Sequence, residues 1–233
     1  MVYPQPMYIM CKQLPLFIIS MAMAFLIACS QQSPIVEVGP YTVSTIDPNV
    51  YHIQDFNSAY PGGEQFDEQG NLTHFNNCSD IYLIVGKEKA LLIDLSNKIT
   101  WADSAEVALR KIVEDRIDGK PLTITFTHNH GDHTGMLPAF MNADVHFALP
   151  QKDFVELKSH FPEDKYSLYD AGERFELGDA TVEAIAVPGH TAGSMVFYLH
   201  GRDLLFTGDA IGSGHGVWIF RSEERRVGKE CVH

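Results

Sequence analysis

Four potential metal ligands lie close together in the segment His128-Asn129-His130-Gly131-Asp132-His133. This segment follows Leu122–Phe126, an apolar run that predicts a buried strand. Side chains two residues apart in an extended chain project to the same side, so His128 and His130 can face one ion. Asp132 and His133 enter the next turn and can face a second position. Because zinc accepts both imidazole nitrogen and carboxylate oxygen, the pattern predicts a zinc site at the end of this strand.

Strand-like and helical patterns alternate along the rest of the chain. Short apolar runs predict strands over 41–46, 50–53, 81–85, 90–95, 122–126, 145–149, 181–187, 194–199 and 203–206. Apolar residues at helical spacing predict helices over 101–117, 134–141 and 152–160. Strands joined by helices indicate a mixed α/β architecture.

The length and charge of the chain limit its function. A chain of 233 residues can hold one ordinary domain with a substantial core. Its formal net charge is −13, whereas binding to nucleic acid depends on Lys and Arg contacts to phosphate. We therefore expect a small-molecule substrate and no nucleic-acid partner.

The N-terminal segment resembles an export signal. Residues 14–28 form an apolar run after Lys12 that is short for a membrane span but typical of a signal peptide. The sequence Leu26-Ile27-Ala28-Cys29 resembles a bacterial lipobox. We expect a signal peptide over 1–29, a lipid anchor at Cys29 to a bacterial membrane, a linker over 30–40, and a location in the periplasm or at the cell surface. A secretory signal with an incidental cysteine is the alternative.

The last residues differ in character from the rest. Arg221–His233 is densely charged and continues neither the strand pattern nor the helix pattern. A solvated tail would explain it. We instead expect foreign or frame-shifted sequence after residue 220, and therefore a C-terminally truncated domain over 41–220.

Several motifs together resemble the metallo-β-lactamase superfamily of zinc hydrolases, in the version typical of glyoxalase II and lactonases. They are Leu91-Leu92-Ile93-Asp94, the His128–His133 segment, Pro188-Gly189-His190 and Phe206-Thr207-Gly208-Asp209, in the expected order. The resemblance covers about 41–220 and implies the four-layer αββα sandwich of this family, with its second half incomplete here.

The resemblance also implies roles for individual residues. His128, His130 and His190 would hold one zinc ion, Asp132 and His133 the other, and Asp209 would bridge both. Asp132 would also be catalytic, orienting the nucleophile and transferring its proton. Asp94 would hydrogen-bond to a ligand. The family places one more histidine some tens of residues after the bridging aspartate, but only His215 and His233 follow Asp209, which puts the second of the two expected zinc ions in doubt.

The implied activity is hydrolysis of a small ester, thioester, lactone or related bond by a metal-bound hydroxide. His130 matches the zinc hydrolases, since the diiron relatives typically carry an acidic residue there. A periplasmic β-lactamase is one alternative, disfavoured by Asp209, because zinc β-lactamases usually have Cys or Ser at that place. A non-catalytic, truncated relic that binds one zinc ion or none is the alternative from another class.

Overall fold

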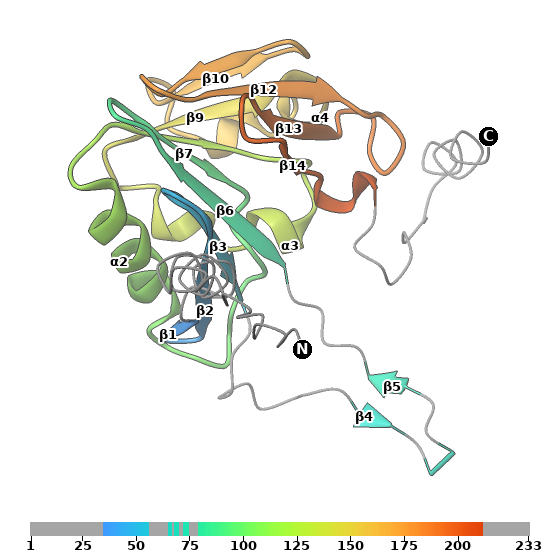
Figure 1. Cartoon of the computed structure of the whole chain (residues 1–233). Helices are drawn as coiled ribbons and strands as arrows, with labels where there is room; N and C mark the ends of the chain where they lie inside the picture. Colours follow the sequence, from blue (N-terminus) through green and yellow to red (C-terminus); the bar gives the residue numbers. More distant parts are fainter. Residues whose placement is uncertain (1–34, 56–64, 67, 70–71, 75–78, 212–233) are drawn as a thin grey trace, which may run out of the picture. The chain divides into compact units, whose positions relative to one another are not determined.

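The computed structural model describes residues 35–55, 65–66, 68–69, 72–74 and 79–211, all within the compact unit Pro34–His233 (Figure 1). The predicted signal peptide, Cys29, His215 and the tail 221–233 lie outside these residues. No helix of the described residues is long and apolar enough to cross a membrane.

Two β-sheets form the framework. The larger sheet contains, in spatial order, β1 (Val36–Val38), β2 (Tyr41–Asp47), β3 (Val50–Gln54), β6 (Asp80–Val85), β7 (Ala90–Ile93), β8 (Leu122–Thr125), β9 (Val145–Pro150) and β10 (Tyr166–Tyr169). The smaller sheet contains β11 (Arg174–Glu176), β12 (Thr181–Ala186), β13 (Met195–Leu199) and β14 (Leu204–Phe206), and β4 (Gln65–Phe66) pairs separately with β5 (Leu72–His74).

Within the described residues, only one helix is long. This is α2 (Ala105–Ile117), which follows β7. The others are single turns, namely α3 (Gly131–Thr134), α4 (Gln151–Phe154) and the 3₁₀ turns η1 (Leu137–Ala139), η2 (Lys158–His160) and η3 (Gly208–Ala210). The predicted mixed α/β sandwich is confirmed, with a helical layer and two sheets in the described residues.

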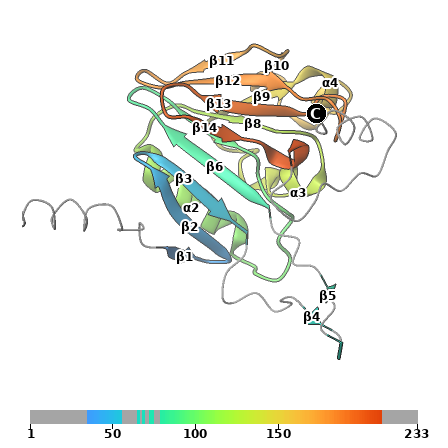
Figure 2. The same cartoon turned by 45° about the vertical axis from the view of Figure 1, so that its right-hand side comes forward.

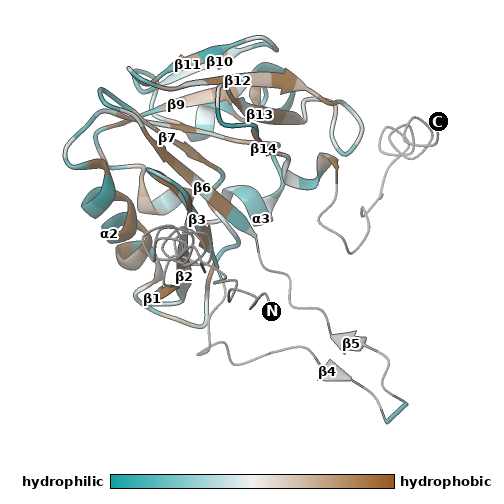
Figure 3. Cartoon of the chain, viewed as in Figure 1, coloured by the Kyte–Doolittle hydropathy of each residue, from teal (hydrophilic) through white to brown (hydrophobic). Residues whose placement is uncertain are grey.

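The larger sheet is buried on both faces. Leu92 points into a core shared with Leu109 and Ile112 of α2, whereas Leu91 and Ile93 point into a second core between the two sheets. Strands buried on both sides consist of nearly continuous apolar residues, as in β7, and Figure 3 shows this concentration of hydrophobic residues in β6 and β7. The two sheets are therefore held together by apolar packing.

The direction of the strands places the candidate site at the end of the larger sheet where β7 and β8 terminate. Strands β7 and β8 are parallel, so Asp94 and the His128–His133 segment emerge side by side. The smaller sheet brings the β12–β13 loop and the turn η3 to the same place (Figure 2). In particular, the N–H of Met195 donates to the carbonyl of Thr127 at 2.8 Å, joining the start of β13 to the end of β8.

Some predicted elements differ from the structure. Residues 134–141 were expected to be helical, but only η1 forms there, because Gly135 N–H and Met136 N–H donate to the carbonyls of Ser96 and Leu95. The predicted helix 152–160 is divided into α4 and η2, and that over 101–117 begins at Ala105. Strand β1 lies within the predicted linker 30–40, and strands β10 and β11 were not expected.

The first core allows a stability test. Phe147 is fully buried in β9 and stacks edge-on with Phe161 at 5.1 Å. We expect Phe147→Ala to lower the free energy of unfolding by about 3–5 kcal/mol, because it removes apolar contacts and leaves a cavity. The measurement is urea unfolding of the full chain. Val107→Ala on α2 is the control, since Val107 is 70% exposed and its loss should cost no more than about 0.5 kcal/mol. Equal unfolding midpoints for both variants would contradict the assigned core.

Candidate metal centre

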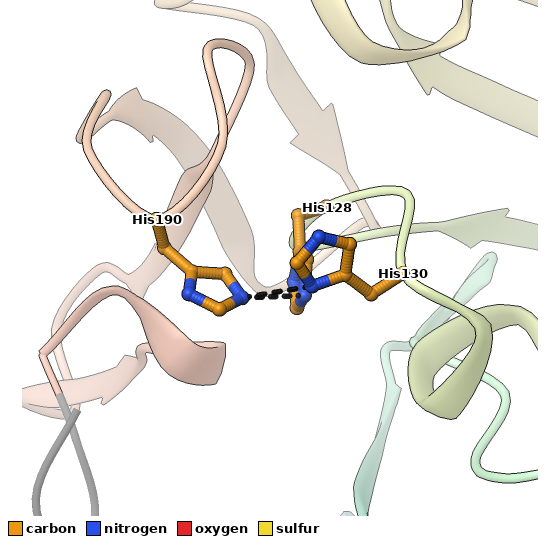
Figure 4. A group of neighbouring side chains, drawn as sticks. All are labelled: His128, His130 and His190. Atoms are coloured by element: carbon orange, nitrogen blue, oxygen red, sulfur yellow. Dashed lines mark hydrogen bonds between the residues drawn. The ribbon is translucent and has the colours of Figure 1, made fainter. Parts of the chain in front are cut away.

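Three histidines from distant parts of the chain converge on one point. His128 and His130 follow β8, and His190 lies on the β12–β13 loop, facing them (Figure 4). The Nε2 atom of His190 is 3.1 Å from Nε2 of His128 and 3.0 Å from Nδ1 of His130. His128 and His190 are buried, so the cluster is largely shielded from water.

The chemistry of these nitrogen atoms fits a cation. A neutral imidazole nitrogen carries either one proton or one lone pair, so His190 Nε2 cannot form two ordinary hydrogen bonds at once. Three lone pairs directed at one ion remove this conflict. In a tetrahedral zinc site with bonds of about 2.0–2.1 Å, neighbouring ligand atoms are about 3.3 Å apart, close to the separations seen here. The residues present therefore fit a metal ion.

A second group lies beside the first. It consists of His128, His133 and Asp209, whose possible ligand atoms all lie within 4.8 Å of one another. One oxygen of Asp209 is 3.2 Å from Nε2 of His133, and the other is 3.5 Å from Nε2 of His190. The carboxylate of Asp209 thus faces both groups, as expected for a bridging residue.

Asp132 is less closely placed than the other predicted ligands. Its carboxylate is 3.9 Å from Nε2 of His133, and it belongs to neither of the two groups. Its side chain is 28% exposed, whereas that of His133 is 6% exposed. Asp132 therefore lies at the open side of the second group, where a substrate could approach.

Asp94 fixes the orientation of two histidines. Its buried carboxylate accepts the Thr127 N–H and hydroxyl at 2.7 Å each, and the Nδ1–H of His133 at 2.9 Å. Because Nδ1 of His133 is the donor, its Nε2 is free to face Asp209. The Thr127 hydroxyl oxygen also lies 3.1 Å from Nδ1 of His128 and can accept its proton, which leaves His128 Nε2 as a ligand atom. The predicted supporting position of Asp94 agrees with this geometry.

The charge states at the site follow from burial and neighbouring charges. Burial, reinforced by nearby His133, lowers the pKa of His128 to about 2, so its ring stays neutral. Burial alone would raise the pKa of Asp209, but its hydrogen bond with His133 and the surrounding histidines lower it to about 2. Burial opposes protonation of His133, yet the carboxylates of Asp94 and Asp209 raise its pKa well above the usual value. His128 and Asp209 are thus in the neutral-imidazole and ionised-carboxylate forms that a metal ion requires, whereas His133 would have to release its Nε2 proton to bind one.

The loop that carries His190 is held by Asp153 of α4. The Asp153 carboxylate accepts the Gly193 N–H at 2.7 Å and the Thr191 hydroxyl at 2.6 Å. A Cβ at position 193 would lie 2.6 Å from an Asp153 oxygen, so the close approach requires glycine. In the described part of the chain, Nδ1 of His190 is buried and makes no hydrogen bond. The position of the His190 ring therefore depends on this anchored loop.

Sequence reasoning missed Asp153, because its partners lie 38 and 40 residues further along the chain. Other histidines of the described residues lie apart from this cluster. His52, His146 and His200 pair with Asp80, Ser167 and Glu183, respectively. The side chain of His74 lies outside the part of the chain whose side chains are described.

Loss of the Asp153 anchor should weaken metal binding. We expect Asp153→Ala to lower the zinc affinity of the full chain roughly tenfold or more, because the His190 loop loses both side-chain acceptors. The measurement is competition with a chromophoric chelator. Glu156→Ala, at an exposed position nearby, is the matched control. An affinity of the Asp153 variant equal to that of the control would show that the loop holds His190 without it.

Comparison with known proteins gives the family. The family model described as the metallo-beta-lactamase superfamily matches residues 79–224. The lactamase-like protein ptaB of Pestalotiopsis fici is 32% identical over 178 residues, which are 75% of this chain and 48% of that protein. An atrochrysone carboxyl ACP thioesterase of Claviceps purpurea is 32% identical over 199 residues, 82% of this chain and 56% of the relative. The chain thus spans about half the length of these curated relatives.

Solved structures share the fold. A metallo-beta-lactamase from Pontibacter korlensis superposes with a TM-score of 0.52 and 20% identity, over 71% of this chain and 69% of that one. A flavo di-iron protein from Thermotoga maritima superposes with a TM-score of 0.55 and 19% identity, over 84% and 48% of the two chains. At this level of identity the likeness concerns the fold alone.

These comparisons correct one prediction and establish another. The expected location, as a bacterial lipoprotein anchored to a membrane through Cys29, is wrong, because the curated thioesterase relatives come from fungi. The motif-based expectation of the family is confirmed, since the family model covers most of the chain from β6 to beyond η3. The chain belongs to the metallo-beta-lactamase superfamily.

Proposed function

We propose that this protein is a zinc-dependent hydrolase that cleaves a thioester. The single observation behind the proposal is the convergence of His128, His130 and His190 within hydrogen-bonding distance, with Asp209 facing both them and His133. Five buried or half-buried side chains of ligand type have no structural reason to meet in this way without an ion. Thioesterases among the curated relatives support the choice of bond.

The proposed roles follow from the positions of the side chains. His128, His130 and His190 would hold one zinc ion, and Asp132, His133 and Asp209 would hold or contact a second. When bound, the ions supply Lewis acidity, polarising the substrate carbonyl and lowering the pKa of water. The hydrogen bonds from Thr127 and His133 to Asp94 orient the side chains around the site, so that Nε2 of His133 faces Asp209.

Asp132 is the residue we propose for proton transfer. Its carboxylate is more exposed than the side chain of His133, and it stands 3.9 Å from Nε2 of that ring. A carboxylate at the open side of the site can accept a hydrogen bond from an attacking water and take its proton. When the tetrahedral intermediate breaks down and its C–S bond is cleaved, the Asp132 carboxyl group can return the proton to the leaving thiolate.

Two alternatives, a periplasmic β-lactamase and a non-catalytic relic, have less support than this proposal. Asp209 stands where zinc β-lactamases usually carry Cys or Ser, and the periplasmic location that favoured such an enzyme is wrong. A non-catalytic relic would not need a buried Asp94 that holds Thr127 and His133 beside two groups of metal-ligand side chains.

Removing one ligand should abolish both metal binding and hydrolysis. We expect His190→Ala to lower the rate of thioester hydrolysis by about 100-fold or more, since even residues that only support ligands cost 10–100-fold. Zinc content, measured by elemental analysis, should fall in parallel. Thiol release from the acetyl thioester of N-acetylcysteamine reports the rate.

His146→Ala is the matched control, because His146 lies exposed on β9 and pairs only with Ser167 among the described residues. It should keep the zinc content and rate of the unaltered chain. Chelation should remove the activity and added zinc should restore it. Unchanged zinc and unchanged hydrolysis in His190→Ala would refute the proposed function.

A further inference from the structure

Loop 94–98, which follows β7, holds the backbone of the turn α3 that carries His133 (Figure 2). The Leu95 N–H donates to the carbonyl of His133 at 2.7 Å. In the other direction, the Gly135 N–H donates to the carbonyl of Ser96 at 2.8 Å. The position of His133 therefore depends on the conformation of this loop.

The loop adopts an unfavourable backbone conformation at two places. Asp94 and Ser96 have φ angles of 64° and 55°, in the left-handed region that residues with a side chain rarely adopt. Such a conformation costs free energy and persists only where the surrounding contacts impose it. Asp94 is held by its hydrogen bonds with Thr127 and His133. A further contact has to hold the loop at Ser96 and beyond.

Asp55, just after the end of β3, supplies this contact. One oxygen of its carboxylate accepts the backbone N–H of Asn97 at 3.0 Å and the side-chain amide of Asn97 at 2.9 Å. The other oxygen accepts the N–H of Ser79 at 2.8 Å, and the Asn97 amide also donates to the Ser79 hydroxyl at 3.1 Å. Because Asn97 directly follows Ser96, this network fixes the loop next to its left-handed residue.

The chemistry of Asp55 indicates a specific role rather than general packing. Asp55 is 5% exposed, and its hydrogen-bond partners among the described residues, Ser79 and Asn97, are both neutral. Burial raises the pKa of Asp55 above its usual value, although these hydrogen bonds oppose the shift. An apolar side chain could fill the same space without the cost of burying a carboxylate, but it could not hold Asn97.

We propose that Asp55 is a positioning residue for the second group of candidate metal ligands. Its carboxylate holds Asn97, and through Asn97 it holds loop 94–98. The loop in turn keeps Nε2 of His133 3.2 Å from an oxygen of Asp209. The inference rests on the proposed function, because it concerns the second of the two ions.

The three histidines of the first group are held by other contacts. His128 and His130 follow β8, which is paired on both sides, with β7 and β9. His190 lies on the loop that Asp153 anchors. Loss of Asp55 should therefore weaken the second metal position and spare the first.

The experiment is a zinc titration of the metal-free full chain, followed by calorimetry, which resolves the two affinities. We expect Asp55→Asn to weaken the second affinity about tenfold and to leave the first within about twofold, because only His133 loses its support. Asparagine fills the same volume but places an amide donor opposite a donor N–H. Cobalt(II) in place of zinc gives a spectroscopic check, since only the absorption that develops with the second equivalent should change.

Asp179→Asn is the matched control. The Asp179 carboxylate also accepts a backbone N–H from a distant segment, that of Lys87 at 2.8 Å. This contact lies at the opposite end of β7 from loop 94–98, so the variant should keep both affinities.

Asn97→Ala tests the same contact from the side of the loop. It should weaken the second affinity less than Asp55→Asn does, because the backbone N–H at position 97 still donates. Combining the two changes should add little to the effect of Asp55→Asn alone, since both act on one contact.

Amide hydrogen exchange of the metal-free chain is a readout that needs neither zinc nor activity. Segment 131–137 should exchange faster in Asp55→Asn than in the unaltered chain, because the loop that holds it is released, whereas β9 should be unaffected. Faster exchange throughout the chain would mean that Asp55→Asn is unfolded, and Asn97→Ala then decides by the same criteria.

The possible failures are distinguishable. If Asp55→Asn keeps both affinities, or weakens both alike in a folded chain, Asp55 does not position the second group, and the inference fails while the proposed function stands. Binding of a single ion by the unaltered chain, with hydrolysis of the acetyl thioester intact, has the same meaning. An unaltered chain that binds no zinc and hydrolyses no thioester would overturn both the inference and the proposed function.

Discussion

The buried carboxylate of Asp94 is the interaction on which the site depends. It joins the ends of two parallel strands through Thr127 and holds the ring of His133 from behind. Asp94 itself adopts a φ of 64°, a left-handed conformation that side chains other than glycine rarely take. Such a conformation persists where its surroundings stabilise it, and three charge-assisted hydrogen bonds in a buried place provide that stabilisation.

The candidate metal centre also depends on how the two sheets pack. The larger sheet supplies the His128–His133 segment, and the smaller sheet supplies His190 and Asp209. Thr127 is the direct link, because its carbonyl accepts the Met195 N–H and its side chain touches Gly208, where a Cβ would lie 2.6 Å away. The apolar core between the sheets therefore sets the distances among the candidate ligands.

The sequence predicted local features far better than distant ones. The His128–His133 segment is recognisable from the sequence because its potential ligands lie close together after an apolar strand. His190 and Asp209 were predicted from their resemblance to family motifs. Asp153 could not be recognised, since its role exists only once the β12–β13 loop packs against α4. Residues 134–141 have the apolar periodicity of a helix, but the N–H groups of Gly135 and Met136 donate to the carbonyls of Ser96 and Leu95 instead of to a preceding helical turn. The mistaken lipoprotein assignment rested on a short N-terminal pattern that says nothing about the rest of the chain.

The tight contact between Gly193 and Asp153 has a consequence for how the sequence of this chain can vary. No side chain fits at position 193, and the neighbouring Thr191 hydroxyl is committed to the same carboxylate, so directed evolution has little freedom in that loop. The rim formed by β3 and β6 carries half-exposed side chains, among them those of His52 and Asp80. Changes in substrate preference should accumulate on that rim, while the histidine loop stays invariant in length and composition.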